Sequence, residues 1–451
     1  MLMLGRSQSL IRTFRFAVPR QLRASCLFSS AGSAVIPDDQ WRDRLKTTIH
    51  FPTWVVPSGS CQAVLKSPRL KEYLGTADHV HPRIRLVRSY SESHQLILCD
   101  PESRVELSRE ALDELQSLAV QLNGPTFDVA LDHSNFTVPY ILQQVLPPEL
   151  HPPPTAFEQI GHVAHLNLKS LHLPYAKLIG EVLVDCIPTI ETVVNKVGEV
   201  SGDYRTYDMD ILAGKDDTYV TLIENGVKLK FDLKNVYWCS RLGGERDFML
   251  KNVFKKYQVI CDPFCGVGAQ VLQAASKLKC KILANDWNPH AVEACRMNVE
   301  LNHIPKDRFQ LSCQDAYDFL TDVGLMADSP LPHHVLLNFP LESPKFLSAL
   351  RWWPASNKKG VIPTVHLYTF AREDGGRRTA EQVAVDLVAD NLLPLGGATE
   401  ESTICRQQEL DALGCEVQTR VIRDVAPGKV VICVSFKATT RLIRHIQGDF
   451  V

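Results

Sequence analysis

The stretch Val259-Ile-Cys-Asp-Pro-Phe-Cys-Gly-Val-Gly268 decides the fold class of this chain, together with Ile282-Leu-Ala-Asn-Asp-Trp-Asn-Pro-His-Ala-Val-Glu293. The first segment predicts a β-strand that enters a glycine turn and opens a helix, and the second predicts a strand that ends in an acid. Gly266 and Gly268 allow a tight turn and let a ligand approach the backbone closely. Asp286 follows the turn by about twenty residues, where a carboxylate can bind a pair of ribose hydroxyls. We therefore expect a nucleoside pocket at the carboxyl edge of a parallel sheet.

Strands and helices alternate from about residue 247 to the end of the chain. Strands are predicted at 259–261, 282–284, 309–312, 335–337 and 365–368, helices at 289–301 and 380–392, and a terminal antiparallel pair at 417–422 and 430–436. Such alternation predicts an α/β fold with a mostly parallel sheet covered by helices. The full G-x-G-x-x-G pattern of dinucleotide enzymes and a P-loop lysine are both missing. A βαβ crossover with ordinary turn glycines is the simpler alternative.

The half of the chain before residue 247 shows fewer patterns. One helix is predicted near 108–122, with Leu112, Leu115 and Leu118 on one face. The proline-rich segment 147–154 predicts a stiff linker and a domain boundary. Apolar and polar residues alternate on both sides of Asn225-Gly226, which predicts a β-hairpin because this pair suits the left-handed dihedral angles of a tight turn.

The first 37 residues differ in composition from the rest. They contain five arginines and several serines, and the first acid of the chain is Asp38. This composition is typical of a mitochondrial presequence, although a plain N-terminal extension remains the alternative. Without these five arginines, 44 of the 49 basic residues remain beside 51 acidic residues in the count, which gives a net charge of −7. Nucleic-acid binding would therefore have to use local basic patches, because the overall charge is acidic.

Cysteine and histidine spacing argues against a structural metal. The thirteen cysteines form no C-x-x-C pair, and no histidine spacing matches them. Cys261 and Cys433 lie in apolar strand contexts and are expected to pack as small hydrophobic residues, as is Cys265 in the turn. His162 and His165 have no third ligand nearby in the sequence, so we expect no metal site.

Several segments in a fixed order resemble one family. The glycine turn and the Asn285-Asp286-x-Asn-Pro segment resemble S-adenosylmethionine-dependent methyltransferases. With the further segments, the chain from about 157 to 345, roughly two fifths of it, resembles the archaeal and eukaryotic tRNA (guanine-37-N1)-methyltransferases. The further segments are Gly161-His-Val-Ala-His-Leu-Asn-Leu168, Val193-Val-Asn-Lys196, Asp203-Tyr-Arg205, Val236-Tyr-Trp-Cys-Ser-Arg-Leu-Gly-Gly-Glu-Arg246 and Asn338-Phe-Pro340.

The resemblance implies an architecture and partners. It implies a presequence at 1–37, a small N-terminal RNA-contacting domain at 38–150, an α+β middle domain at 155–246 and a Rossmann-like methyltransferase domain at 247–451. The segment at 161–168 would be a structural helix. A monomer that binds the anticodon stem-loop and the core of tRNA is expected, with no membrane association. The presequence predicts the mitochondrial matrix, and a further nuclear or cytoplasmic pool stays open.

The reaction requires a base, because guanine N1 carries a proton near neutral pH. A carboxylate within hydrogen-bond reach can remove it, and a fixed guanidinium can stabilise the negative charge that grows on O6. The resemblance makes Glu245 the base and Arg205 the O6 partner, and it places Asn338 and Pro340 at the guanine and the methyl donor. Plainer alternatives exist: Glu245 could pair with Arg241 or Arg246, Arg205 could be a surface residue, and Asn338-Phe-Pro340 an ordinary turn.

The resemblance also assigns contacts to S-adenosylmethionine and to the target nucleotide. Phe264, Gly266 and Gly268 would approach the methionine portion, Asp286 the ribose and Asp315 the adenine. Arg241, Asp262 and Asn338 complete the expected cofactor site, and Tyr237 would contact the substrate with Arg205. The chain departs from the family at Asn-Phe-Pro, where Asn-Leu-Pro is usual, at Ala269, where proline is usual, and at the two glycines before Glu245.

Three other functions fit parts of this pattern. An aminocarboxypropyl transferase of the wybutosine pathway would share the fold and the cofactor but use a different carbon of it. A catalytically silent RNA-binding factor would not need Glu245, Asp286 and Asn338 together. A methyltransferase of small molecules or proteins would leave the residues before 247 unexplained.

Overall fold

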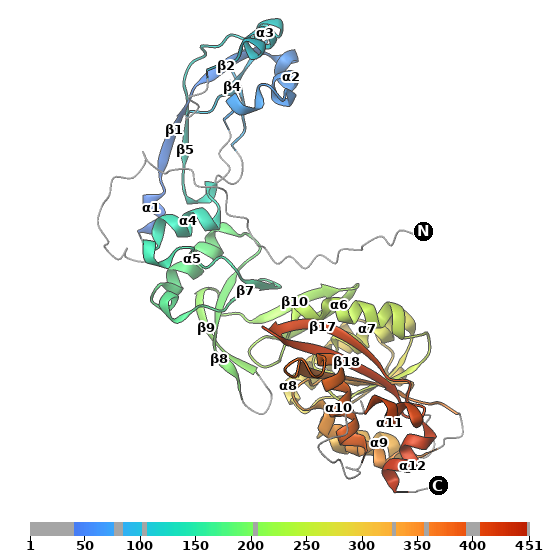
Figure 1. Ribbon diagram of the computed structural model, residues 1–451. Helices are drawn as coiled ribbons and strands as arrows, with labels where there is room; N and C mark the ends of the chain where they lie inside the picture. Colours follow the sequence, from blue (N-terminus) through green and yellow to red (C-terminus); the bar gives the residue numbers. More distant parts are fainter. Residues whose placement is uncertain are drawn as a thin grey trace. The chain divides into compact units, whose positions relative to one another are not determined.

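We describe a computed structural model of the chain, which covers residues 40–75, 84–101, 106–201, 206–326, 331–355, 360–393 and 406–448. The described residues divide into two compact units (Figure 1). The larger unit is built on residues 217–448 together with the segment 198–208. The smaller unit contains the described residues from 40 to 197 and Met209–Asp216.

A seven-stranded sheet forms the centre of the larger unit. Its strand order is β14-β13-β12-β15-β16-β18-β17. The strands are β12 (Val259–Asp262), β13 (Lys281–Asn285), β14 (Phe309–Ser312), β15 (His334–Leu337), β16 (Thr364–Arg372), β17 (Gln418–Ala426) and β18 (Lys429–Lys437). The first five in this order are parallel, whereas β18 runs antiparallel to both β16 and β17. The predicted α/β fold, the parallel strands and the terminal antiparallel pair are confirmed.

Helices cover both faces of this sheet. On one face, α9 (Ala316–Leu325), η9 (Ser343–Trp352) and α10 (Ala380–Leu392) pack on a core that includes Cys261, Leu337, Leu367 and Val434. On the other face lie α6 (Gly243–Phe248), the π-helical turn η7 (Met249–Val253), α7 (Ala269–Leu278) and α8 (Pro289–Leu301). The remaining helical segments are η6 (Ser240–Leu242), η8 (Lys306–Arg308), α11 (Gln407–Ala412) and α12 (Thr440–Gln447).

A hairpin precedes the sheet in the chain. Strands β10 (Tyr219–Glu224) and β11 (Val227–Asp232) pair antiparallel, and Asn225 and Gly226 adopt φ values of 48° and 73°. These dihedral angles are those of the predicted tight turn. The side chains of Val227, Leu229 and Phe231 are buried, and β11 packs against α7 and α8. The hairpin therefore belongs to the core of the larger unit.

The smaller unit contains two hydrophobic cores. One lies at the three-stranded sheet β2-β4-β3 and includes Trp54, Ile97 and Leu115; the other includes Trp41, Leu142 and Ile179. Its strands are β1 (Thr47–Phe51), β2 (Thr53–Pro57), β3 (Val87–Ser89), β4 (His94–Leu98), β5 (Phe127–Leu131), β6 (Glu158–Ile160), β7 (Val163–Leu166), β8 (Thr192–Ser201) and β9 (Thr206–Gly214), the last two reaching beyond the unit at one end. Its helices are α1 (Trp41–Arg44), η1 (Ser58–Ser60), α2 (Cys61–Lys66), η2 (Lys71–Tyr73), α3 (Arg109–Ser117), η3 (His133–Asn135), α4 (Val138–Val145), η4 (Pro148–Leu150), η5 (Ser170–Tyr175) and α5 (Ala176–Cys186).

Three features of this unit differ from expectation. Leu112 is 40% exposed, because α3 buries Ala111 and Leu115 instead. The segment 161–168 forms a turn and strand β7 rather than a helix, since β7 pairs with both β6 and β8. Residues on both sides of the prolines at 147–154 share the second core, which therefore runs across the expected boundary.

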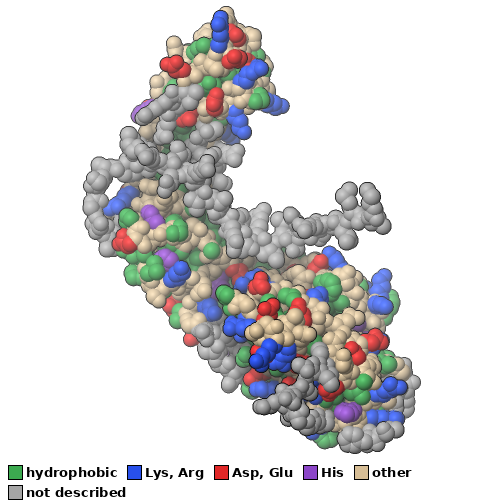
Figure 2. Space-filling view, in the orientation of Figure 1, with side chains coloured by type: hydrophobic (Ala, Val, Ile, Leu, Met, Phe, Trp, Pro, Cys, Tyr) green, Lys and Arg blue, Asp and Glu red, His purple; other side chains and the backbone are tan. Residues whose placement is uncertain are grey.

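The surface carries both signs of charge. On the face drawn in Figure 2, lysine and arginine side chains lie interspersed with acids. Within the described ranges, no helix is long and apolar enough to cross a membrane, and no group of three potential ligands could hold a metal ion.

Candidate active site

Four predicted site residues follow the carboxyl ends of adjacent parallel strands. Asp262 ends β12, Asp286 follows β13, Asp315 lies beyond β14 and Asn338 follows β15. The chain runs outward from β12 to β13 and β14, then returns to β15 on the other side of β12. The loops after β12 and β15 therefore diverge, which makes this edge the topological switch point where open α/β sheets bind ligands.

Asp286 fastens the glycine turn to the start of α8. Its Oδ2 accepts a hydrogen bond of 2.8 Å from the N–H of Gly266, and its Oδ1 accepts one of 2.9 Å from the N–H of Asn288. Burial raises the pKa of Asp286, although N–H groups of Asn288, Gly266 and Trp287 oppose this shift. An ionised carboxylate has about four acceptor positions. Three backbone N–H groups act on Asp286, so at least one acceptor position is left for a ribose hydroxyl.

The two glycines of the turn are required for different reasons. Gly266 and Gly268 have φ values of +55° and +87°, which other residues rarely adopt. A Cβ at Gly268 would also lie 2.8 Å from Leu272 Cδ1 and 2.9 Å from Cys295 Sγ, so packing excludes a side chain there. A Cβ at Gly266 would meet nothing within 4 Å. The open side of the turn at Gly266 is therefore where a ligand can approach the backbone.

Asp262 is a second acid beneath the turn. It is 4% exposed, and its Oδ1 accepts a hydrogen bond of 3.0 Å from the N–H of Phe264. Burial raises the pKa of Asp262 from 3.8 to about 7; the Phe264 N–H opposes this shift and the charge of Asp286 adds to it. Cys265 is also buried, with the pKa of its thiol raised by its hydrogen bond with Cys295 and by burial, so it packs as predicted.

Asp315 caps a helix. Its carboxylate accepts hydrogen bonds from the N–H groups of Tyr317 and Asp318 at 2.7 and 3.4 Å, at the start of α9. The side chain is exposed at the carboxyl edge of the sheet. Its contact with adenine remains a prediction.

Phe339 explains the departure from Asn-Leu-Pro. Its ring stacks on Phe264 at 5.2 Å between centroids, and Phe346 packs edge-on against Phe264 at 5.1 Å. The turns after β12 and β15 are thus held together by aromatic rings. Pro340 lies beside them, where its carbonyl accepts a hydrogen bond from the N–H of Phe370. It also lines a cavity of about 520 Å³ with Leu341, Pro344, Phe370, Arg372 and Lys429.

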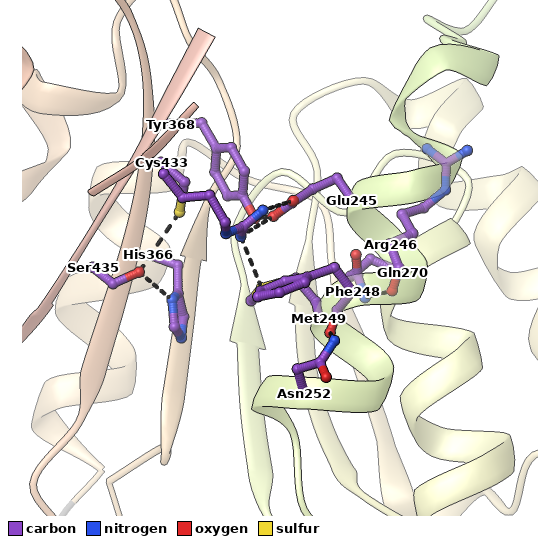
Figure 3. A network of polar contacts seen from close by, with 11 residues as sticks. Glu245, Arg246, Phe248, Met249, Asn252, Gln270, His366, Tyr368, Cys433 and Ser435 are labelled. Carbon is purple, nitrogen blue, oxygen red and sulfur yellow. Dashed lines mark hydrogen bonds and ion pairs between the residues drawn. The ribbon is translucent and has the colours of Figure 1, made fainter. Parts of the chain in front are cut away.

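Glu245 lies in a polar cluster on the face of the sheet that α6, α7 and α8 cover (Figure 3). It is 7% exposed on α6. Its Oε1 accepts hydrogen bonds from the Tyr368 hydroxyl at 2.6 Å and from Arg420 Nη2 at 2.8 Å, and its Oε2 accepts one from Arg420 Nη1. Glu245 therefore forms an ion pair with an arginine of β17.

The expected alternative partners of Glu245 lie elsewhere. Arg246 binds Glu224 through Nε at 2.6 Å and Nη2 at 2.7 Å, and its guanidinium lies over the Trp238 ring. Arg241 is exposed on η6. A pairing of Glu245 with either arginine is therefore wrong, and the prediction missed Tyr368 and Arg420.

Strand register brings Tyr368 and Arg420 together. Cys433 on the central strand of this region, β18, pairs with Tyr368 on β16 and with Arg420 on β17. Tyr368, Cys433 and Val431 share a small core on this face. The two residues that bind Glu245 thus lie in one row across β16, β18 and β17.

The segment that carries Glu245 is hydrogen-bonded to the helices that begin next to the glycine turn. Asn288 Nδ2 donates a 2.7 Å hydrogen bond to the carbonyl of Asn235, and Gln270 Nε2 donates one of 3.3 Å to the carbonyl of Arg246. Between these points lies Tyr237, which is 43% exposed. The starts of α7 and α8 therefore hold the segment 235–246 next to the glycine turn. Arg205 lies outside the described residues.

Comparisons with known proteins agree with this arrangement. Residues 221–388 match the family described as the TRM5/TYW2 methyltransferase domain, and residues 138–218 match the TYW2 N-terminal domain. A tRNA (guanine(37)-N(1))-methyltransferase 2 of Phaeodactylum tricornutum is 46% identical over 88% of this chain and 76% of its own length. A tRNA (guanine(37)-N(1))-methyltransferase of Drosophila melanogaster is 31% identical over 90% and 86%.

Solved structures share the fold. Trm5b of Pyrococcus abyssi superposes with a TM-score of 0.59 at 20% identity, over 86% of this chain and 99% of its own. An aTrm5 solved in complex with tRNALeu gives a TM-score of 0.60 at 19% identity, with the same two shares. The likeness at this identity concerns the fold.

Proposed function

This chain belongs to the tRNA (guanine(37)-N1)-methyltransferase family, and we infer that it transfers a methyl group from S-adenosylmethionine to N1 of guanosine 37 in tRNA. One observation carries this conclusion: 46% identity to a relative of that name over 88% of this chain and 76% of the relative. The arrangement supports this reaction: Asp286 at the carboxyl edge of the sheet is placed to accept a ribose hydroxyl, and Glu245 supplies a buried carboxylate.

The residues around the glycine turn fit S-adenosylmethionine. Asp286 has at least one acceptor position left for a ribose hydroxyl, and Gly266 leaves the backbone open to a ligand. Phe264 and Asn338 would border the methionine portion, Asp262 would support the turn from below, and the adenine would lie toward Asp315. Arg241 would reach the cofactor from the exposed side of η6. When bound, the cofactor supplies an electrophilic methyl group on a positively charged sulfur.

Glu245 would act as the general base. It takes the proton from guanine N1 as the bond between N1 and the methyl carbon forms and the bond between that carbon and sulfur breaks. General-base help of this kind is worth about 10²–10⁴-fold in rate. Arg205, Asn338, Pro340 and Tyr237 would hold the guanine, with the Arg205 guanidinium at O6, where negative charge develops. These roles rest on motif position.

We propose that the tRNA contacts include the anticodon stem-loop and the tRNA core, and that the protein acts as a monomer. Membership of the family supports tRNA as the substrate. The near-balanced charge favours local contacts over a broad basic face. Sedimentation of the protein with one tRNA transcript tests the stoichiometry: a complex of one chain with one tRNA is expected, and a stable dimer would contradict it.

We further propose that residues 1–37 direct the protein to the mitochondrial matrix. Their five arginines and the absence of an acid before Asp38 support this. Residues 1–40 fused to a fluorescent reporter should bring it into mitochondria, and a variant with the five arginines changed to glutamine serves as the control. A reporter that stays diffuse in the cytosol would overturn the proposal.

The reaction is tested by product analysis. Unmodified tRNA transcripts with guanosine at position 37 are incubated with donor labelled in the methyl group, and the nucleosides are mapped. We expect N1-methylguanosine at position 37 and no label in a transcript with adenosine there. A product with the mass of an aminocarboxypropyl adduct would identify the alternative transfer, and no product at all would favour a silent RNA-binding protein.

A further inference from the structure

Two side chains far from Glu245 in the sequence surround its carboxylate. Tyr368 and Arg420 come from β16 and β17, and each donates hydrogen bonds to it. We propose that Tyr368 and Arg420 are positioning residues of the general base and that they leave Oε2 of Glu245 as the oxygen that accepts the N1 proton. This inference rests on the proposed function, in which Glu245 is the base.

The distribution of donors separates the two carboxylate oxygens. Oε1 accepts two hydrogen bonds, one from the Tyr368 hydroxyl and one from Arg420 Nη2. In the described part of the chain, Oε2 accepts one, from Arg420 Nη1. Because each oxygen offers about two acceptor positions, Oε1 is filled and Oε2 keeps one position. The N–H of guanine N1 can use that position without displacing either donor.

The geometry fixes the plane of the carboxylate. A guanidinium that binds both oxygens forms a planar, two-point contact, which a single-point donor cannot. Arg420 is itself held, since its guanidinium carbon lies 3.9 Å from the centre of the Phe248 ring and its Nη2 lies 3.8 Å from Met249 Sδ. The fixation is needed because Gly243 and Gly244 open α6, and a Cβ at Gly244 would meet nothing within 4 Å. The rigid sheet therefore supplies the order that the short helix lacks.

The charges around Glu245 support these roles. Burial, above all, raises the pKa of Tyr368 well above its ordinary value, so its hydroxyl stays protonated and donates. The pKa of Arg420 is raised too: burial lowers it, and the hydrogen bonds and charge of Glu245 outweigh that effect. Two further titratable groups at the cluster are neutral, because burial raises the pKa of Cys433 to about 12 and lowers the pKa of His366 to about 3. Arg420 is thus the one cation that faces Glu245 among the described residues, since Arg246 is bound to Glu224.

The experiment measures single-turnover methylation against pH, with donor and tRNA saturating. Arg420→Gln keeps hydrogen bonding without the charge, so the acid limb of the profile should move to higher pH by about one unit, the low end expected for a partly exposed ion pair. Arg420→Lys keeps the charge without the two-point contact, so the limb should stay and the plateau should fall about tenfold. Tyr368→Phe should lower the plateau by a few-fold to about tenfold, with the limb near its wild-type position.

A matched control separates positioning from stability. Arg246→Gln removes a buried arginine from the same helix, but that arginine binds Glu224 rather than Glu245, so its acid limb should coincide with that of the wild type. The proposal is overturned if both Arg420 variants keep the wild-type profile within about twofold. It is also overturned if Arg420→Gln lowers the rate by the same factor at every pH, with its acid limb where Arg246→Gln has it.

The same series tests the premise separately. A wild-type protein that makes no N1-methylguanosine refutes the proposed function, whatever the variants do. A Glu245→Gln variant that keeps the wild-type rate and acid limb refutes Glu245 as the base. The positioning role alone is refuted if the wild type makes N1-methylguanosine, Glu245→Gln loses the rate and the acid limb, and the Arg420 variants still keep the wild-type profile.

Discussion

The glycine turn with Asp286, and the cluster of Glu245 with Tyr368 and Arg420, belong to one unit but are assembled in different ways. The turn is built from near neighbours: Asp262 and Phe264 are two residues apart, and Asp286 and Gly266 are twenty apart. The Glu245 cluster is built from distant strands, because 123 residues separate Glu245 from Tyr368 and 175 separate it from Arg420. The first region uses backbone N–H groups and glycine dihedral angles, whereas the second uses side chains placed by the register of β16, β18 and β17.

This difference teaches which part of the chemistry depends on the whole fold. The hydrogen bonds of the turn need only one βαβ unit and the start of the next helix, since they lie between β12 and Asn288. The cluster requires the antiparallel return of β17 and β18 as well. We therefore expect changes at the turn to act on cofactor binding and changes at the cluster to act on the chemical step.

The largest expected effect is at the cluster. Glu245→Gln keeps the shape of the side chain but cannot accept the proton, so single-turnover methylation should fall by about 10²-fold or more. Donor and tRNA affinities should stay near those of the wild type. The fall of the wild-type rate toward acid pH should disappear in this variant. Wild-type methylation by Glu245→Gln, with chemistry shown to limit the rate, would mean that another group takes the proton.

Asp262 gives the turn its own pH dependence. Its pKa is raised from 3.8 to about 7, so the native state holds this proton more tightly than the unfolded state. The resulting contribution to the free energy of unfolding is present below pH 4 and is lost as pH rises through 7, by at most about 4 kcal/mol. Asp262→Asn can still accept the Phe264 N–H and should remove this dependence. Urea unfolding of both proteins between pH 5 and 8 checks it: a difference in stability that does not vary with pH would contradict the assignment.

Asp286→Ala should act on the cofactor. The change removes a charge-assisted acceptor for the ribose hydroxyls and should weaken S-adenosylmethionine binding by about 1.5–3 kcal/mol. Calorimetric titration measures this directly. Asp322→Ala, on the exposed side of α9, is a matched control and should bind normally. Equal affinities for wild type and Asp286→Ala would show that the ribose is bound elsewhere.

The smallest effect is expected at Asp315. Loss of its two hydrogen bonds to the start of α9 should destabilise the protein by about 1 kcal/mol, the usual value of a helix N-cap. Asp315→Ser keeps a capping oxygen and should recover most of that stability in thermal unfolding. If Asp315→Ser binds the donor as tightly as wild type, the residue is a cap alone and its contact with adenine is refuted.

The sequence predicted the first region better than the second for a physical reason. Strand periodicity, turn glycines and the acid after β13 are local signals, and α8 and α10 begin and end at the predicted residues. Arg420 carried no such signal. The segment 417–422 was predicted as a strand, but no pattern in it indicated that Arg420 is the residue that reaches Glu245. Only the pairing of β17 with β18 reveals this, and a strand gives no indication of its partner's register.

Family resemblance supplied Glu245, but not its surroundings. The plainer alternative paired Glu245 with Arg241 or Arg246, which are close to it in the sequence. Arg246 is instead drawn to Glu224 on the hairpin strand β10, where Gln273 also donates to the same carboxylate at 2.8 Å. Arg246 therefore binds Glu224 and not Glu245, and no local pattern in the sequence indicates this pairing.

We infer that the two regions meet at guanine N1, and the structure of a ternary complex measures this most directly. Crystals of the protein with S-adenosylhomocysteine and a tRNA bearing guanosine 37 would give two distances. We predict that Glu245 Oε2 lies within about 3.2 Å of N1 while Asp286 holds the ribose hydroxyls of the cofactor. A guanine whose N1 faces a different acid, with Glu245 still enclosed by Tyr368 and Arg420 and out of its reach, would contradict the account.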